Sequence, residues 1–210
     1  MIERLENLLQ LVLLGICAGI SLKRSLTTKK HTWAMLFLSA FVYFLGDLYW
    51  QFYMIFYGET PPYSFIPYLS WYASFLFLLM LIIGIEGGER RKRYHNAFLW
   101  LIPVFTLGAA AFYTSRGVGI IDAIISVSIF TALFYRCLGA LISRFKEDSF
   151  KNSRMLYILI LICLVCEYTS NITSCFWMGD TLLNPYFWSD TILSLSFLLL
   201  PAALKKAEEE

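Results

Sequence analysis

The chain has 210 residues and a formal net charge of +2, with 59% hydrophobic and 15% charged residues. A soluble domain usually carries about 25% charged residues, so this composition argues against a soluble enzyme. It favours a protein that is embedded in a membrane.

Seven long apolar runs divide the chain. About 20 helical residues cross a hydrocarbon core of roughly 30 Å, and a chain inside lipid must satisfy its own backbone hydrogen bonds. Each run is therefore predicted to be a spanning helix. The predicted fold is an all-α polytopic integral membrane protein, a bundle of seven transmembrane helices. In chain order the runs are Leu5–Leu22, Trp33–Tyr57, Tyr63–Ile85, Ala97–Tyr113, Val118–Ile142, Met155–Trp177 and Pro185–Leu204.

The first run follows a mixed leader, in which Glu3 and Glu6 stand against Arg4. A signal peptide carries a positive leader, so we expect this run to be a retained helix. The gaps between runs are short and leave no room for a soluble catalytic or nucleotide-binding domain. We therefore expect residues 1–210 to form a single transmembrane domain.

Basic residues fall in alternate gaps, and this pattern predicts the orientation. Cytoplasmic loops of membrane proteins are enriched in Lys and Arg. The N-terminus is therefore predicted to lie outside and the C-terminus in the cytoplasm, with the chain in the plasma membrane. The basic gaps suit anionic headgroups, so we expect contact with membrane lipids and none with nucleic acid. These gaps hold Lys23, Arg24, Lys29, Lys30, Arg90, Arg91, Lys92, Arg93, Arg144, Lys146, Lys151, Arg154, Lys205 and Lys206, against Arg4 and Arg116 on the other side.

The cysteines and histidines predict neither a metal site nor a cofactor. Cys163 and Cys166 form a C-x-x-C pair inside a predicted helix, without a second pair. His31 and His95 lie in gaps predicted to be cytoplasmic. Structural zinc needs four converging ligands, so a zinc site and a zinc-dependent hydrolase are not expected. A retinal protein is not expected either, because no predicted helix interior carries a lysine.

Ionisable residues inside the predicted helices are the main functional signal, because charge in lipid is costly and usually functional. Asp47 and Glu167 lie near the middle of the second and sixth helices. Asp122 and Asp190 lie about one turn inside the outer ends of the fifth and seventh, and Arg136 lies in the inner third of the fifth. The four acids have no basic residue at comparable depth. They must be protonated, hydrated or paired with a ligand cation.

Polar residues in four of the helices recur at three- or four-residue intervals, which places them on one helix face. Helices that face lipid would not arrange polar groups in this way, so the stripes are predicted to face a shared interior. Asp47 and Glu167 are accordingly predicted to face one cavity and to avoid lipid. The stripes are Ser39, Tyr43, Asp47 and Gln51; Asp122 and Ser126; Cys163, Glu167, Ser170, Asn171 and Ser174; and Tyr186, Asp190 and Ser194.

Aromatic residues accompany these acids in the outer half, and an organic cation is attracted both by carboxylates and by aromatic faces. We therefore expect an outward-facing cavity that binds a small cationic or amphipathic solute, as in a sensor or small transporter. The first and fourth helices would be scaffold, and a sensor would need a partner membrane protein for its output. The predicted ligand-binding residues are Asp47, Trp50, Asp122, Glu167, Asn171, Tyr186 and Asp190.

A second hypothesis is an intramembrane lipid hydrolase, because paired carboxylates in different environments can act as general acid and base. Gly46-Asp47 and Ser189-Asp190 resemble the paired Gly-Asp and Ser-Asp elements of the lysoplasmalogenase-like membrane proteins. The resemblance covers these two dipeptides and implies hydrolysis of the vinyl-ether bond of lysoplasmalogens. In that family further helices follow the Ser-Asp helix, whereas here Asp190 lies in the last one. Membership is therefore not inferred.

A third hypothesis is a non-catalytic subunit whose polar groups only pack. Polar side chains join membrane helices through hydrogen bonds worth roughly 0.6 kcal/mol each. Arg136 could pair with an acid or extend to the cytoplasmic face, and Glu86 is expected to be an interfacial charge. All three functions fit one fold, and a fold alone does not select among them.

Overall fold

A computed structural model describes residues 2–58, 61, 65–87, 96–116, 119–176 and 182–209, without the side chains of residues 2–4 and 149. All regular structure in these residues is helical, and seven helices are long and apolar enough to cross a membrane. The chain is therefore an integral membrane protein, as the sequence predicts. The elements are α1 (Ile2–Thr28), α2 (His31–Tyr57), α3 (Phe65–Glu86), the short 3₁₀ helix η1 (Ala97–Trp100), α4 (Leu101–Ser115), α5 (Ile120–Arg144), the 3₁₀ helix η2 (Asp148–Phe150), α6 (Arg154–Ser174) and α7 (Pro185–Ala207).

The predicted runs match these helices, with differences at their ends. α1 continues beyond Leu22 to Thr28, so Lys23 and Arg24, which follow the apolar run, still belong to the helix. The fourth run begins as a 3₁₀ turn before α4, because the side chain of Asn96 accepts a hydrogen bond from the Phe98 backbone N–H and caps η1. The predicted ends at Tyr63, Val118 and Trp177 lie outside the described residues.

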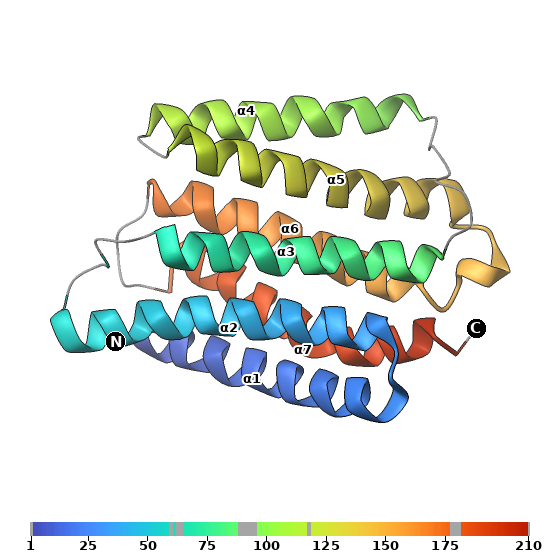
Figure 1. Cartoon of the computed structure of the whole chain (residues 1–210). Helices are drawn as coiled ribbons and strands as arrows, with labels where there is room; N and C mark the ends of the chain where they lie inside the picture. The colour runs from blue at the N-terminus through green and yellow to red at the C-terminus, as the bar shows by residue number, and fades with distance from the viewer. Residues whose placement is uncertain are drawn as a thin grey trace.

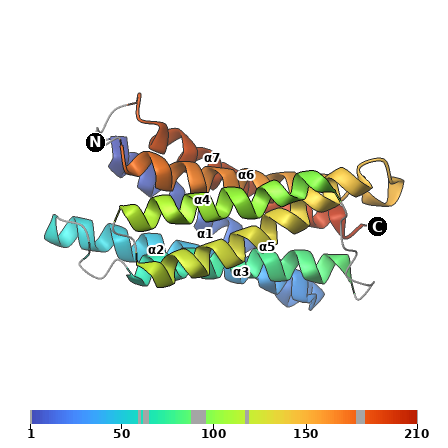
Figure 2. The same ribbon diagram turned by 90° about the horizontal axis from the view of Figure 1, so that it is seen from above.

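Six of the described helices form a closed ring, in which each helix packs against the next in the order α1, α2, α3, α5, α6, α7, and α7 packs back on α1. α4 lies outside the ring against α5, at the edge of the bundle (Figure 1). All of them run along one long axis (Figure 2). Because successive helices alternate in direction, the two termini lie at opposite ends of the bundle (Figure 1). We call these the N-terminal end and the C-terminal end.

The half of the bundle near the C-terminal end has an apolar interior. Large aliphatic side chains from five helices are fully buried there. In water, burial of each such side chain stabilises a fold by roughly 1.5–3 kcal/mol. In lipid, close packing of these side chains supplies most of the stabilising free energy. These residues are Leu36, Leu78, Leu81, Ile82, Leu133, Leu156, Ile160, Leu200 and Leu204.

Two polar contacts near the C-terminal end join helices that are distant in sequence. Arg136 of α5 forms an ion pair with Glu86 at the end of α3. The expected interfacial charge at Glu86 is thus the partner of Arg136, which leaves Arg136 far from the acids of the other half. At the end of α7, Glu208 accepts hydrogen bonds from Trp33 Nε1 at 2.8 Å and from Lys30 Nζ at 3.2 Å. These contacts fasten the C-terminus to the start of α2.

Candidate functional site

Three carboxylic side chains from separate helices lie inside the half of the bundle near the N-terminal end. Asp47 of α2 is 7% exposed, and Glu167 of α6 and Asp190 of α7 are each 4% exposed. All three lie close enough to interact electrostatically with one another. The polar stripes of α2, α6 and α7 thus turn their central acids inward, as predicted, and neither Asp47 nor Glu167 faces lipid.

Asp47 has one satisfied oxygen and one unsatisfied oxygen. Trp71 Nε1 of α3 donates a hydrogen bond of 2.8 Å to Oδ1, whereas the buried Oδ2 has no partner among the residues that the structure describes. The preceding residue, Gly46, explains how α3 comes so near. A Cβ at this position would lie 2.9 Å from Ser70 Cβ and 3.3 Å from Trp71 Nε1. Glycine therefore permits the close contact of α2 and α3 that brings the indole to the carboxylate.

Glu167 is held by neutral donors on both oxygens. The Tyr43 hydroxyl donates to Oε2 at 3.0 Å, and Asn171 Nδ2 donates to Oε1 at 3.1 Å. Asn171 lies one helical turn after Glu167, so the stripe of α6 supplies both the acid and its donor. The Tyr43 ring packs against Phe197 of α7 and Phe75 of α3, with centroids 5.4 Å and 6.4 Å away. This apolar packing closes the site toward the C-terminal end.

Asp190 is bonded from α1, which sequence reasoning assigned to the scaffold. Gln10 Nε2 donates to Asp190 Oδ1 at 3.3 Å, and the side chains of Glu6 and Tyr186 also hydrogen-bond with Asp190. Glu6 and Gln10 are buried. They are one helical turn apart, and Cys17 and Ser21 continue the same face. A stripe of this spacing was therefore present in the first run, although it lies close to the predicted start of the helix.

Of the remaining predicted residues, Tyr186 joins this cluster through its hydrogen bond with Asp190, whereas Trp50 and Asp122 lie around it. Trp50 is half-buried and packs against Trp71, with ring centroids 6.3 Å apart. Tyr186 is half-buried beside Asp190. Asp122 lies in the first turn of α5, where a carboxylate suits the positive end of the helix dipole. It is half-buried and, among the described residues, forms no hydrogen bond with the three acids, although it acts electrostatically on Tyr68 and Tyr72 of α3.

The charge of the site is not balanced by any described basic side chain. Among the described residues, the ion pairs Arg136–Glu86, Lys30–Glu208, Arg144–Glu147 and Lys205–Glu209 all lie toward the C-terminal end. At the N-terminal end, the Arg116 guanidinium lies over the rings of Phe112 and Phe176, at 5.5 Å and 5.2 Å. Asp47, Glu167 and Asp190 therefore need protons, water or a bound cation to remain buried.

A metal ion does not fit this arrangement. The described His, Cys, Asp and Glu side chains nowhere form a group of three with the spacing of a metal site. The groups that donate to the carboxylates are an indole, a phenol and an amide. Their N–H and O–H groups stabilise an anion, and the indole and amide nitrogens do not ligate a cation.

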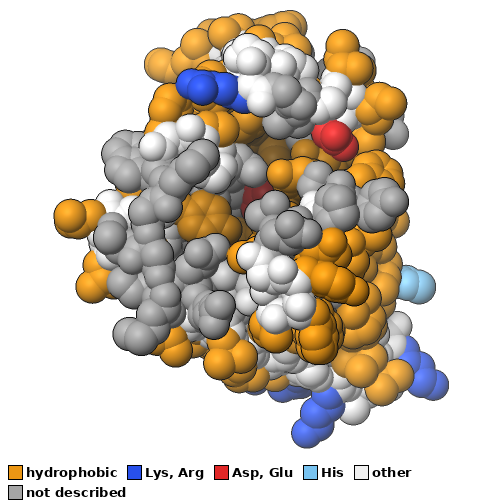
Figure 3. Space-filling model, turned by 90° about the vertical axis from the view of Figure 1, so that its left-hand side faces the viewer, with side chains coloured by type: hydrophobic (Ala, Val, Ile, Leu, Met, Phe, Trp, Pro, Cys, Tyr) orange, Lys and Arg blue, Asp and Glu red, His pale blue; other side chains and the backbone are white. Residues whose placement is uncertain are grey.

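The surface at the N-terminal end is hollowed. Figure 3 looks at this end of the bundle and shows a depression between hydrophobic side chains, with acidic atoms visible deep inside it.

Comparison of the chain with protein-family profiles, with curated proteins and with solved structures found no match. The chemistry of the site must therefore be argued from its own residues.

Proposed function

We propose that the protein binds a small organic cation, or an amphipathic solute with a cationic group, between α2, α6 and α7. One observation supports this most directly. Asp47 Oδ2 is buried without a hydrogen-bond partner in the described part of the chain, beside two further carboxyl groups that no described basic side chain neutralises. An unpaired buried carboxylate oxygen costs several kcal/mol in an apolar setting, so a ligand that supplies a positive donor would be bound favourably.

The aromatic side chains beside the acids favour an organic cation over an inorganic one. The rings of Tyr43 and Trp71 lie beside the acids, with centroids 6.2 Å apart, and Trp50 extends this aromatic wall. Aromatic faces attract alkylammonium groups by about 0.5–2 kcal/mol, more when the site is dry. An ammonium group could thus donate to Asp47 and Glu167 while its carbon atoms contact the rings.

The proposed orientation places this site outward. The alternating basic gaps favour an N-terminus outside the cell and a C-terminus in the cytoplasm of a plasma-membrane protein. The apolar interior near the C-terminal end favours a sensor, or a carrier in one closed conformation, over an open channel. A sensor would pass its state to a partner membrane protein.

The test is ligand binding by the parent and by two isosteric variants. Asp47→Asn and Glu167→Gln remove charge and keep size, so each should weaken the binding of alkylamines and quaternary amines at least tenfold, about 1.4 kcal/mol. Binding by the parent should also weaken as the pH falls, because a protonated carboxyl group does not attract a cation. Asp148→Asn, at an exposed position near the C-terminal end, is the matched control and should bind like the parent.

Thermal shifts and titration calorimetry with a set of amines would measure this. If no amine stabilises the parent, or if Asp47→Asn and Glu167→Gln bind as tightly as Asp148→Asn, the cation-binding proposal fails. Parent-like behaviour of both variants in every assay would instead favour a non-catalytic subunit.

An intramembrane hydrolase is the second candidate, and one observation favours it. Asp47 and Asp190, from the two dipeptides that resemble the lysoplasmalogenase-like proteins, lie within electrostatic range of each other in different hydrogen-bond environments. The Ser189 hydroxyl, however, donates to the Pro185 carbonyl of its own helix at 3.0 Å. For an enzyme, Asp47→Asn would abolish the release of aldehyde from a lysoplasmalogen while substrate binding remained, because acid–base groups act mainly in the transition state.

A further inference from the structure

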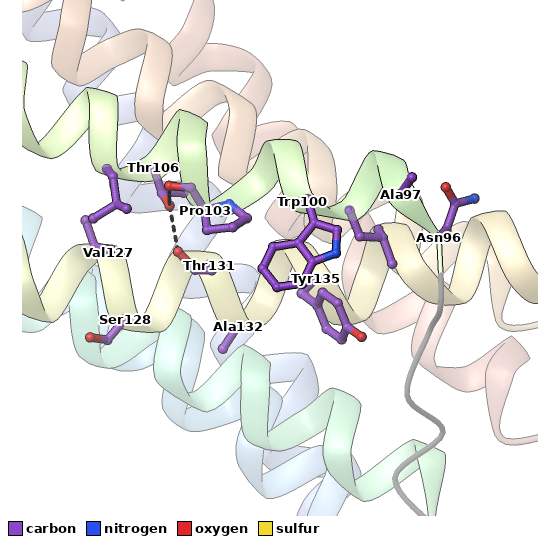
Figure 4. A pocket seen from close by; sticks show the side chains of 12 residues that line it. Asn96, Ala97, Trp100, Pro103, Thr106, Val127, Ser128, Thr131, Ala132 and Tyr135 are labelled. Atoms are coloured by element: carbon purple, nitrogen blue, oxygen red, sulfur yellow. Dashed lines mark hydrogen bonds between the residues drawn. The ribbon is translucent and has the colours of Figure 1, made fainter.

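A second cavity lies far from the acidic site, on the outer side of the bundle between α4 and α5. Its volume is about 910 Å³. Figure 4 shows its lining side chains, which come from η1 and α4 on one side and from one face of α5 on the other. Thr106 and Thr131 are joined by a hydrogen bond of 2.7 Å beside Val127 and Ser128, and Trp100 and Tyr135 lie nearer the other end (Figure 4).

The position of this groove in the membrane is the first clue to its occupant. α4 is the least buried of the described spans, so the groove beside it faces lipid. It extends from Asn96, where η1 begins, to Leu107, near the middle of that span. Eleven residues at 1.5 Å each cover roughly 16 Å, which is about half of a 30 Å hydrocarbon core. The groove thus has the depth of one leaflet, that of the C-terminal end.

The lining is suited to an acyl chain. The hydroxyl groups of its threonines and serine are satisfied within the protein, because Thr106 Oγ1, which is bonded to Thr131, also donates to the Ile102 carbonyl at 3.1 Å and Ser128 Oγ donates to the Ile124 carbonyl at 2.7 Å. A hydrocarbon chain could lie along them without leaving a polar group unpaired. Trp100, which is 77% exposed, is the kind of amphipathic residue that lies at the headgroup level.

The distribution of basic side chains indicates that the lipid headgroup is anionic. Every basic side chain that the structure describes, apart from Arg116, belongs to the half near the C-terminal end. Basic residues near a membrane surface attract anionic lipids by about 1 kcal/mol each. The mouth of the groove opens on this same half.

We propose that the groove between α4 and α5 binds one acyl chain of an anionic phospholipid from the leaflet at the C-terminal end. The bound lipid fills the space that the short α4 leaves beside α5, and it joins α4 to the ring of helices. This site is independent of the acidic site at the N-terminal end. A negative result for lipid binding would leave the cation-binding proposal unchanged.

The experiment counts phospholipids that remain bound to the purified full-length protein. Native mass spectrometry after mild detergent exchange should find one phosphatidylglycerol per chain, retained more strongly than phosphatidylcholine. Ala132→Trp, which places an indole in the groove, should reduce that occupancy about tenfold. Ile83→Trp adds the same side chain on a lipid-facing position of α3 in the same half of the bundle, and it should retain the lipid.

Thr131→Leu, a smaller change in the groove wall, serves as a second variant if Ala132→Trp does not fold, and it should lower occupancy in the same direction. Loss of the lipid from the groove variants alone supports the proposal. Equal retention by Ala132→Trp and Ile83→Trp overturns it, as does equal retention of phosphatidylcholine and phosphatidylglycerol by the parent. A parent dimer that becomes a monomer in Ala132→Trp would assign the groove to protein contact and would also overturn it.

Discussion

At the scale of single residues, the acidic site depends on which oxygen has a donor. Asp47 receives its described hydrogen bond from Trp71, and Glu167 receives two from Tyr43 and Asn171. The three carboxyl groups are therefore unequal. Among the described residues, Asp47 Oδ2 has no donor, whereas both oxygens of Glu167 have one. Under the proposed function, a cation would therefore bind first at Asp47.

The first residue-scale prediction concerns the indole donor. Trp71→Phe keeps an aromatic ring but leaves both Asp47 oxygens without a described donor, so it should lower the free energy of unfolding by about 1–3 kcal/mol. Trp50→Phe, on the neighbouring ring, is the control and should cost less. The double variant Asp47→Leu/Trp71→Phe should recover part of the loss, because an apolar pair leaves no buried group unsatisfied. Thermal unfolding in detergent measures all three, and equal loss in Trp71→Phe and Trp50→Phe would refute this role.

At the scale of helices, the contact of α2 with α3 positions the site, and Gly46 allows the two helices to approach closely. Gly46→Ala would place a Cβ 2.9 Å from Ser70 Cβ, an atom fixed to the backbone of α3. The helices would have to separate, at a cost of about 1–3 kcal/mol, and the Trp71–Asp47 bond would lengthen. Gly108→Ala is the matched control, since nothing lies within 4 Å of its Cβ.

That control should be neutral or stabilising by up to about 1 kcal/mol, because alanine favours a helix over glycine. Chemical or thermal unfolding of the two variants decides the matter, with amine binding as a second readout. Equal stability of Gly46→Ala and Gly108→Ala would show that the α2–α3 contact is looser than the structure has it.

The helical stripes also explain how much of the site could be predicted from sequence. Periodicity identifies the buried face of a helix, and it correctly predicted that Asp47, Glu167 and Asp190 face inward. It does not tell which helices are neighbours. The bonds Gln10–Asp190 and Trp71–Asp47, and the pair Arg136–Glu86, depend on the order of helices in the ring, which no pattern within one helix contains. The place of α4 outside the ring was missed for the same reason.

At the scale of the whole molecule, the two halves of the bundle differ in character. The half near the N-terminal end has buried acids and a hollow surface, and the half near the C-terminal end has an apolar interior and most of the described basic side chains. The positions of the acids along the helices and of the basic gaps between them predicted acids in one half and basic residues in the other, because the cost of burying charge in lipid leaves few alternatives. A ligand could enter the acidic site from the N-terminal end without crossing the bundle.

The last prediction concerns which end faces outward. In a chain with Cys175 changed to Ser, a cysteine at Leu183, which is 88% exposed at the N-terminal end, should react with a membrane-impermeant thiol reagent on intact cells. A cysteine at the exposed Lys146, near the C-terminal end, should react only after the cells are permeabilised. The other native cysteines are buried and serve as an internal blank. The basic gaps are the physical reason, since Lys and Arg are retained on the cytoplasmic side during insertion. The reverse labelling pattern would turn the acidic site toward the cytoplasm, and its ligand would then have to be an intracellular cation.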